Sequence, residues 1–222
     1  MKFSKDYVLL CHVTTMIPGE KHGDLLEAKG GNAFPFLAFL DSEGNVIAVH
    51  NEDRTAAEFA KTGEKAKAYV AAKAKADQGD ASAKIDFITL QLSMGQLKLE
   101  EARKKLKEAG VPTKEQQAKF DGEVLNAMVM EMAKGVEDEA GLKAVGKKFY
   151  EMHKAGKPGP TSGPAIQAFY ILSLGAADDL KDVETFEALL KILRAKFGDL
   201  DGARLFFQAK EKRLAELKAE KK

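Results

Sequence analysis

The stretch from Gly30 to His50, GGNAFPFLAFLDSEGNVIAVH, constrains the fold of this chain more than any other. Phe36 to Leu40 is an apolar run rich in aromatic residues, and Val46 to Val49 is a second, shorter apolar run. Turn-forming residues separate the two runs, and Gly44 among them can take the positive φ that a tight turn requires. The pattern therefore predicts two antiparallel strands joined by a tight turn.

The residues before this hairpin predict a further strand and a helix. Tyr7 to Val13 (YVLLCHV) is a nearly continuous apolar run, which is typical of a strand buried on both faces of a parallel sheet. Asp24 to Lys29 predicts a short helix that Gly30 and Gly31 end. We therefore expect a right-handed βαβ crossover that places Tyr7 to Val13 parallel to Phe36 to Leu40.

The Phe34-Pro35 step, the apolar strand that ends in Asp41, the Glu43-Gly44 turn and the last short strand together resemble the second half of a thioredoxin-like domain. The resemblance covers roughly the first third of the chain. It implies that Pro35 is cis and that Phe34 and Pro35 present backbone atoms to an extended peptide or a thiol substrate. These two residues are our candidate substrate- or peptide-binding residues.

The same resemblance implies that the sheet lacks a central strand. The family's Cys-x-x-Cys is absent from this chain. In the family that motif follows a central strand, which would lie between Tyr7 to Val13 and Phe36 to Leu40. Three explanations stay open: the true start lies upstream of Met1, the two strands close directly on each other, or another molecule donates a strand.

After the hairpin the sequence predicts helices. Thr55 and Glu58 form a capping-box pattern that opens a helix running through Ala76. From Ala81 onward apolar residues recur at helical spacing, and two helices that end near Gly95 and at Gly110 predict a helical hairpin. The stretch LQLSMGQLKLEEARKKLKEAG resembles a tetratricopeptide-type repeat, although the aromatic signature of that repeat is missing. Further helices are expected from Thr113 onward, over Ala140 to Ala155, over Ala165 to Leu174, over Val183 to Phe197 and over Ala203 to Lys222, with a loop at Lys157 to Pro164.

These patterns predict an α/β plus all-α fold in two domains. Residues 1–78 are expected to form a partial thioredoxin-like βαββα unit. Residues 81–222 are expected to form a tetratricopeptide-like array of antiparallel helical hairpins. The boundary between them is placed at Gln78-Gly79-Asp80, where the first long helix closes.

Few residues suggest a catalytic, redox or metal-binding role. Cys11 is the single cysteine, and its place in an apolar run favours a buried, small hydrophobic residue over a reactive thiol, so we keep it as a low-probability thiol. The spacings of the four histidines, His12, His22, His50 and His153, match no metal signature. Met128, Met130 and Met132 are mainly expected to fill the core. No catalytic residue, metal site or cofactor is predicted.

Charge and composition limit the partners. The 35 basic and 34 acidic residues give a formal net charge of +1, which argues against nucleic acid and anionic membranes as partners. The amino terminus shows no signal peptide and no membrane span, so we expect a soluble chain. One cysteine does not identify the compartment, and the sequence leaves the oligomeric state open.

Three functions from different classes follow. The first is a non-catalytic, thioredoxin-like and helical-repeat protein that binds a protein partner. The second is a thiol-disulfide oxidoreductase whose redox-active amino-terminal part is absent from this chain. The third is a glutathione-transferase-like enzyme, on the architectural analogy of a small thioredoxin-like domain joined to a helical one.

Overall fold

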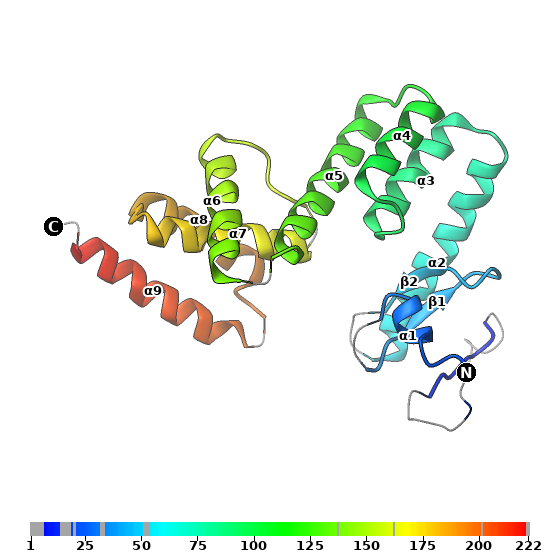
Figure 1. The fold of residues 1–222 in the computed structure, drawn as a ribbon, viewed down its shortest axis with the longest axis horizontal. Helices are drawn as coiled ribbons and strands as arrows, with labels where there is room; N and C mark the ends of the chain where they lie inside the picture. Colours follow the sequence, from blue (N-terminus) through cyan, green and yellow to red (C-terminus); the bar gives the residue numbers. More distant parts are fainter. Residues whose placement is uncertain are drawn as a thin grey trace. The chain divides into compact units, whose positions relative to one another are not determined.

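The computed structural model describes residues 7–13, 19, 21–31, 34–50, 54–136, 138–161, 163–200 and 202–220. Within these residues the protein is mostly helical, with nine helices and one antiparallel pair of strands (Figure 1). The chain divides into two compact units: Met1–Leu90 with Glu108–Gly110, and Gln91–Lys107 with Val111–Lys222. The domain boundary expected near Gly79 precedes this division and stays a prediction.

The hairpin predicted from Gly30 to His50 is confirmed. Strands β1 (Ala38–Leu40) and β2 (Val46–Val49) pair in antiparallel fashion, with Ala38 opposite Val49 and a register shift after Phe39. Strand β2 has the predicted bounds, whereas β1 begins two residues later than Phe36.

A hydrogen-bonded turn joins the two strands. The Asp41 side chain accepts hydrogen bonds from the backbone amides of Glu43 at 2.9 Å and Asn45 at 2.8 Å, which is the local bonding that favours aspartate at the start of a turn. Gly44 has φ +80°, a conformation that glycine adopts without steric cost. Burial by itself would raise the pKa of Asp41, but the hydrogen bonds from Asn45 and Glu43 outweigh it and lower this pKa.

The short helix predicted over Asp24 to Lys29 is also present. Helix α1 (Leu25–Ala28) is a single turn, and the chain leaves it through Gly30 at φ +80°. Gly31 follows and is buried, and a Cβ built on it would lie 2.9 Å from Cγ of Phe36. Glycine therefore allows the chain to pass closely beside the segment that leads into β1.

The prediction of a strand over Tyr7–Val13 is wrong. In the described part of the chain the sheet consists of β1 and β2, and Tyr7–Val13 forms no strand. Figure 1 accordingly draws the dark-blue segment at the amino-terminal end without an arrow. The expected parallel pairing and βαβ crossover are therefore absent from the described residues. An apolar run shows that a segment can be buried in a sheet, but burial also needs a neighbouring strand.

Helix α2 (Ala56–Asp77) packs on the hairpin. Its N-cap is Thr55, whose side chain accepts a hydrogen bond from the amide of Glu58 at 3.2 Å, as the capping pattern predicted. The helix contacts β2 and buries Ala66 and Tyr69. Val70, which the helical pattern also selected as apolar, is half exposed.

Helices α3 (Ala81–Ser93) and α4 (Leu99–Ala109) have the predicted apolar positions. The ring of Tyr69 on α2 meets Phe87 of α3 edge-on, with centroids 5.2 Å apart. Gly95 and Gly110 follow the two helices with φ of +69° and +128°, as expected for helix-ending glycines. Of the apolar positions expected to face inward, Ile85, Ile88, Leu92, Ala102 and Leu106 are buried, whereas Leu99 is only half-buried.

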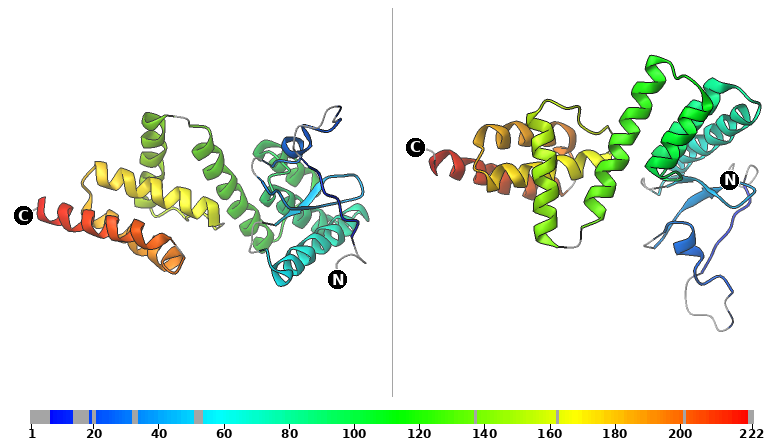
Figure 2. Two further views of the ribbon diagram at one scale, coloured as in Figure 1. Left: turned by 90° about the horizontal axis from the view of Figure 1, so that it is seen from below. Right: turned by 45° about the horizontal axis from the view of Figure 1, so that its top comes forward.

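Five more helices follow in the second unit: α5 (Lys114–Lys134), α6 (Glu139–Lys154), α7 (Gly163–Asp179), α8 (Val183–Phe197) and α9 (Ala203–Glu220). Helix α7 contacts α5, α6 and α8, and α8 in turn contacts α9, as both views of Figure 2 allow the reader to follow. Two apolar clusters result. The first joins α5, α6 and α7 through Val129, Val145, Phe149, Ala165 and Phe169. The second joins α7, α8 and α9 through Leu174, Phe186, Leu189, Leu193, Phe207 and Leu217.

Capping residues fix where most of these helices begin. Thr113 and Gln116 form a reciprocal capping box at the start of α5, the helix expected from Thr113 onward. Asp138 caps α6 through the amide of Gly141 at 2.7 Å, and Asp182 caps α8 through the amide of Thr185 at 3.1 Å. The bounds predicted for α8 are confirmed.

Helix α7 corrects two predicted bounds. It begins at Gly163, inside the predicted loop of Lys157 to Pro164, so that Pro164 is helical. It also continues past Gly175 to Asp179, whereas Leu174 was expected to be its last residue. The helix continues because Ala176 and Ala177 prolong its buried face, and that packing outweighs the local cost of one glycine. A regular tetratricopeptide-type repeat stays a prediction.

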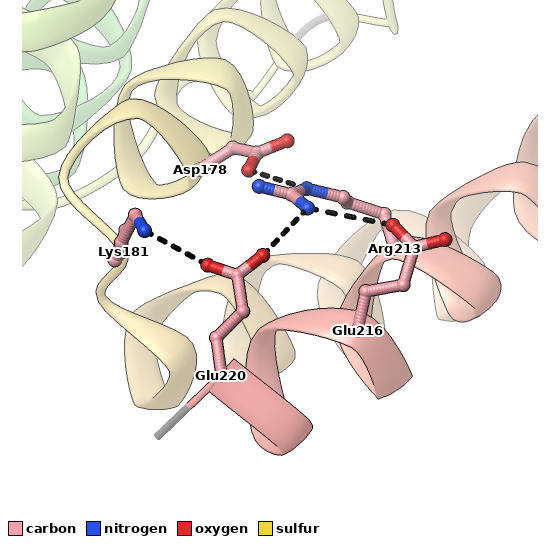
Figure 3. Close-up of polar contacts among 5 residues, drawn as sticks. All are labelled: Asp178, Lys181, Arg213, Glu216 and Glu220. Atoms are coloured by element: carbon pink, nitrogen blue, oxygen red, sulfur yellow. Dashed lines mark hydrogen bonds and ion pairs between the residues drawn. The ribbon is translucent and has the colours of Figure 1, made fainter.

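The last helix is joined to the preceding two by charged side chains (Figure 3). Arg213 of α9 donates through Nε to Asp178 of α7 at 2.8 Å and also contacts Glu216 and Glu220 on its own helix. Glu220 accepts a second pair from Lys181 at 2.9 Å. Lys181 lies in the turn between α7 and α8, where it has φ +53°.

Candidate protein-binding surface

The two residues singled out by the thioredoxin-like resemblance lead directly into β1. The Phe34–Pro35 peptide bond is cis, as predicted. Both residues are exposed, and the Phe34 side chain keeps 67% of its accessible surface. An aromatic side chain in water beside the start of a strand is the type of group that anchors a bound polypeptide.

Strand β1 is hydrogen-bonded to a strand on one side in the part of the chain that the structure describes. Its register with β2 extends one step further, because the amide of His50 donates to the carbonyl of Leu37 at 2.8 Å. In the described residues β2 is the only strand beside β1. The opposite edge of β1 therefore has no strand paired to it. We call Phe34, Pro35 and the unpaired edge of Ala38–Leu40 the β1 edge.

A buried cluster fixes the hairpin on α2. His50 is 6% exposed, its ring stacks on Phe59 with centroids 4.0 Å apart, and its Nδ1 lies 2.8 Å from Oγ1 of Thr62. Thr62 donates its hydroxyl to the carbonyl of Glu58 at 3.2 Å, so its oxygen accepts the hydrogen bond from His50. His50 therefore has a structural role in the support of the β1 edge, one that its sequence context did not reveal.

Three consecutive apolar side chains near the amino terminus face solvent. Val8 is 98% exposed, Leu9 is 74% exposed and Leu10 is 73% exposed. We call these three residues the exposed segment. Single exposed apolar residues are common on protein surfaces, but a contiguous run indicates an interaction site.

Tyr7 holds one end of the exposed segment against the first unit. Its ring meets Phe39 of β1 edge-on, with centroids 5.0 Å apart, and its hydroxyl donates to the carbonyl of Gly63 on α2 at 3.2 Å. Tyr7 thus contacts both the hairpin and the helix beneath it. The exposed segment begins at this anchored residue.

Cys11 differs from its expected environment. We predicted a buried, small hydrophobic residue, and the structure shows an exposed free cysteine. Residues 7–13 form no strand among the described residues, so Cys11 is not enclosed in a sheet as expected. Exposure alone does not make a reactive site, and the role of Cys11 as a thiol stays a low-probability prediction.

The other candidate residues form no metal site. Among the residues that the structure describes, no group of three or more histidine, cysteine, aspartate or glutamate side chains is arranged to hold a metal ion. His22 is exposed, whereas His153 meets the ring of Tyr170 edge-on at 6.1 Å. Burial lowers the pKa of His153, and the charge of Lys154 adds to the effect.

The second unit contains two polar clusters that sequence reasoning missed. Asn126 on α5 is buried and holds the loop before α7 by hydrogen bonds to Thr161. Asp182 accepts hydrogen bonds from Tyr150, Lys154 and Thr185. Tyr150 and Asp182 are 32 residues apart in sequence, so local spacing gave no signal for their contact.

The described helices include none that is long and apolar enough to cross a membrane. Comparisons with protein-family models, with curated proteins and with solved structures found no match.

Proposed function

We propose that this chain is a non-catalytic protein-binding module that receives an extended polypeptide at the β1 edge. The single observation that supports this function is the unpaired edge of β1, preceded by the exposed side chain of Phe34. An unpaired strand presents a row of backbone donors and acceptors that another strand can satisfy. Addition of a strand to a sheet edge is a recurrent mode of peptide recognition.

The chemistry of the edge indicates what kind of peptide it binds. Residues Phe34 to Leu40 contain no charged side chain. A bound strand therefore gains main-chain hydrogen bonds and apolar contacts, whereas a charged side chain placed against this surface would lose hydration without finding an opposite charge. We propose an apolar, β-branched or aromatic segment as the ligand.

The thioredoxin-like resemblance supports the same proposal. It implies that Phe34 and Pro35 present backbone atoms to an extended peptide, and both residues are exposed. No observation favours the enzymatic alternatives. A single cysteine cannot cycle through an intramolecular disulfide.

A displayed library of random peptides, selected on the full chain, tests this function. We expect enrichment of uncharged, β-forming sequences, and we expect Phe34→Asp to weaken the binding of a selected peptide at least tenfold in fluorescence anisotropy. Val111→Asp is the matched control, because Val111 is 95% exposed and lies outside the first unit. Equal affinity of the wild type and Phe34→Asp would contradict the proposal.

N-methylated versions of the selected peptide test the binding mode. A methyl group on every second amide blocks the donors on one side of an extended peptide and leaves the other side intact. We expect one of the two alternating sets to abolish binding and the other to have little effect. If both sets bind equally well, the peptide does not bind as an added strand.

A further inference from the structure

The β1 edge is short. Strand β1 has three residues, Ala38–Leu40, and alternate residues of a strand direct their backbone groups to opposite sides. At most two of the three can therefore offer hydrogen bonds on the side away from β2. A stable interface buries about 800 Å² on each partner, which is more than the backbone of two residues provides. A polypeptide that binds at this edge therefore needs a second surface of the same unit.

The exposed segment is an apolar surface that the chain holds in place. Val8, Leu9 and Leu10 are exposed to 98%, 74% and 73%, whereas Tyr7 before them and His12 after them are half-buried. Tyr7 and His12 both interact with other residues of the chain. The segment is therefore held on either side and presents its apolar side chains between these two residues.

Tyr7 also ties the exposed segment to β1. Its ring meets Phe39 of β1 with centroids 5.0 Å apart, and its hydroxyl donates to the carbonyl of Gly63 on α2 at 3.2 Å. The three residues after Tyr7 extend at most about 11 Å. Seven residues of a bound strand extend about 23 Å. A peptide that occupies β1 is therefore long enough to reach the exposed segment.

The two surfaces agree in chemistry. Tyr7 to Val13 and Phe34 to Leu40 contain no Asp, Glu, Lys or Arg. An apolar peptide that contacts both would bury no charge of either surface, and it would cover apolar side chains that otherwise face water. One uncharged ligand therefore suits both surfaces.

We propose that the exposed segment forms one wall of the peptide site at the β1 edge, and that Val8, Leu9 and Leu10 determine which peptides bind. The backbone of β1 accepts any extended peptide, since main-chain hydrogen bonds give affinity and side-chain contacts give specificity. The exposed segment adds a requirement for large apolar side chains at the peptide positions that reach it. The proposal rests on the proposed function, because it describes the specificity of the same site.

Charge exchange between the segment and the peptide tests this inference. A peptide selected on the full chain is synthesised with lysine at each position in turn, and fluorescence anisotropy measures its affinity for the wild type and for Val8→Asp/Leu10→Asp. We expect the variant to bind the original peptide about tenfold more weakly, because its carboxylates lose hydration against an apolar ligand. Lysine at the position that meets the segment should reverse the preference. Misfolding alone would give no such reversal, and the absence of any reversing position would overturn the proposal.

Val111→Asp/Leu205→Asp is the matched control. It adds the same two charges at side chains that are 95% and 75% exposed and that lie in the second unit. We expect this control to bind the original peptide like the wild type, and we expect both double variants to keep the circular dichroism spectrum of the wild type. Equal affinities of the two double variants for the original peptide would overturn the proposal.

Cys11 allows a direct measurement of where the peptide lies. It is the single cysteine, it follows Leu10 directly and it is exposed, so an environment-sensitive fluorophore can be attached at this position alone. We expect the selected peptide to shift the emission of the labelled wild type and to leave that of labelled Cys11→Ser/Val111→Cys unchanged. A peptide that binds without changing the emission at Cys11 would place the exposed segment outside the site.

Failure of this inference can be told apart from failure of the proposed function. Phe34→Asp tests the β1 edge, and Val8→Asp/Leu10→Asp tests the exposed segment. If only Phe34→Asp weakens peptide binding, the function stands and the role of the segment in specificity is rejected. If Phe34→Asp leaves binding unchanged, the function itself is rejected, and this inference with it.

Discussion

Asn126 shows how one buried polar side chain fixes the position of a loop. Its Nδ2 donates to Oγ1 of Thr161 at 3.0 Å and to Glu123 at 3.0 Å, and its Oδ1 accepts from the amide of Thr161 at 2.7 Å. The loop from Ala155 to Thr161 is thereby held to α5 before the chain enters α7. Sequence reasoning missed Asn126 because it considered only the apolar positions of this helix.

We predict that Asn126→Ala lowers the free energy of unfolding by about 1–3 kcal/mol, because the substitution removes the hydrogen bonds that this buried side chain makes to Thr161 and Glu123. Urea denaturation followed by circular dichroism measures the change. Gln117→Ala is the control on the same helix: Gln117 donates an exposed hydrogen bond to Asp121 at 2.8 Å, so its loss should cost less than about 0.5 kcal/mol. Equal losses would mean that Asn126 does not hold the loop.

Asp182 links α6 to the start of α8. It accepts hydrogen bonds from the hydroxyl groups of Tyr150 and Thr185, each at 2.7 Å, and from Nζ of Lys154 at 3.1 Å. Burial alone would raise the pKa of Asp182, but the hydrogen bonds from Tyr150, Thr185 and Lys154 dominate and hold this pKa far below its usual range. The carboxylate therefore stays charged in the folded protein at pH values where it is protonated in the unfolded chain.

A depressed pKa in the folded state fixes the direction of the pH effect. The stabilisation by Asp182 is complete above the pKa of an unfolded aspartate, about 3.9, and it is lost as the pH falls from there toward the folded pKa. We predict that Asp182→Asn destabilises the protein by about 1.5–3 kcal/mol at neutral pH, the usual range for hydrogen bonds to a charged group. The difference from the wild type should shrink below about pH 4. A constant difference from pH 7 to pH 2 would contradict this interpretation.

Helices α6 and α7 approach each other closely at a glycine. A Cβ built on Gly146 would lie 2.6 Å from the carbonyl oxygen of Leu172, which is backbone and cannot rotate away. Gly175 on α7 is the opposite case, because a Cβ there meets nothing within 4 Å. The same substitution should therefore have opposite effects at these two helical positions.

We predict that Gly146→Ala destabilises the second unit by about 1–3 kcal/mol, since the two helices must move apart. Gly175→Ala should stabilise it by about 0.5–1 kcal/mol, because alanine has the higher helix propensity and nothing opposes its methyl group. Thermal melts measure both effects: the melting temperature should fall for Gly146→Ala and rise for Gly175→Ala. A stabilising Gly146→Ala would show that the close contact is absent.

The sequence predicted elements best where local chemistry decides them. The bounds of β2 and α8, the Thr113 capping box and the turn at Gly44 all depend on residues within one or two turns of chain. The failures depend on distant neighbours. Tyr7–Val13 has the pattern of a strand but no strand beside it, and Gly175 does not end α7 because the packing of Ala176 and Ala177 outweighs its low propensity.

The candidate site, too, was predicted only where it depends on local sequence. Phe34 and Pro35 were found from their local step and the turn that follows them. The missing neighbour of Phe36 to Leu40 was expected from the resemblance. The exposure of Val8, Leu9 and Leu10 could not be predicted, because it depends on which strands share the sheet. An apolar side chain in water and one in a core have the same sequence pattern.

On the scale of the whole molecule, we predict that residues 81–222 fold without the residues before them. Helices satisfy their backbone hydrogen bonds internally, and α5 to α9 contact one another in succession. The isolated segment should give a cooperative thermal melt by circular dichroism with a helical spectrum. Residues 1–78 alone should not, because two strands and a helix bury little apolar surface against the entropy of ordering the chain. A cooperative melt of the small fragment would show that the hairpin and α2 are sufficient for stability.

Helix α9 is held by charged contacts, whereas α6 and α7 meet at a steric contact. The two contacts therefore differ in their sensitivity to salt. Exposed ion pairs such as Lys181–Glu220 are screened when the Debye length falls from about 10 Å at 0.1 M salt to about 3 Å at 1 M. The close approach of α6 and α7 at Gly146 is steric and does not change with salt. Amide hydrogen exchange should therefore accelerate in α9 at high salt and change less in the turn of α6 around Gly146. Ionic strength thus selects which part of this unit opens first, and the carboxyl-terminal helix is the part that responds.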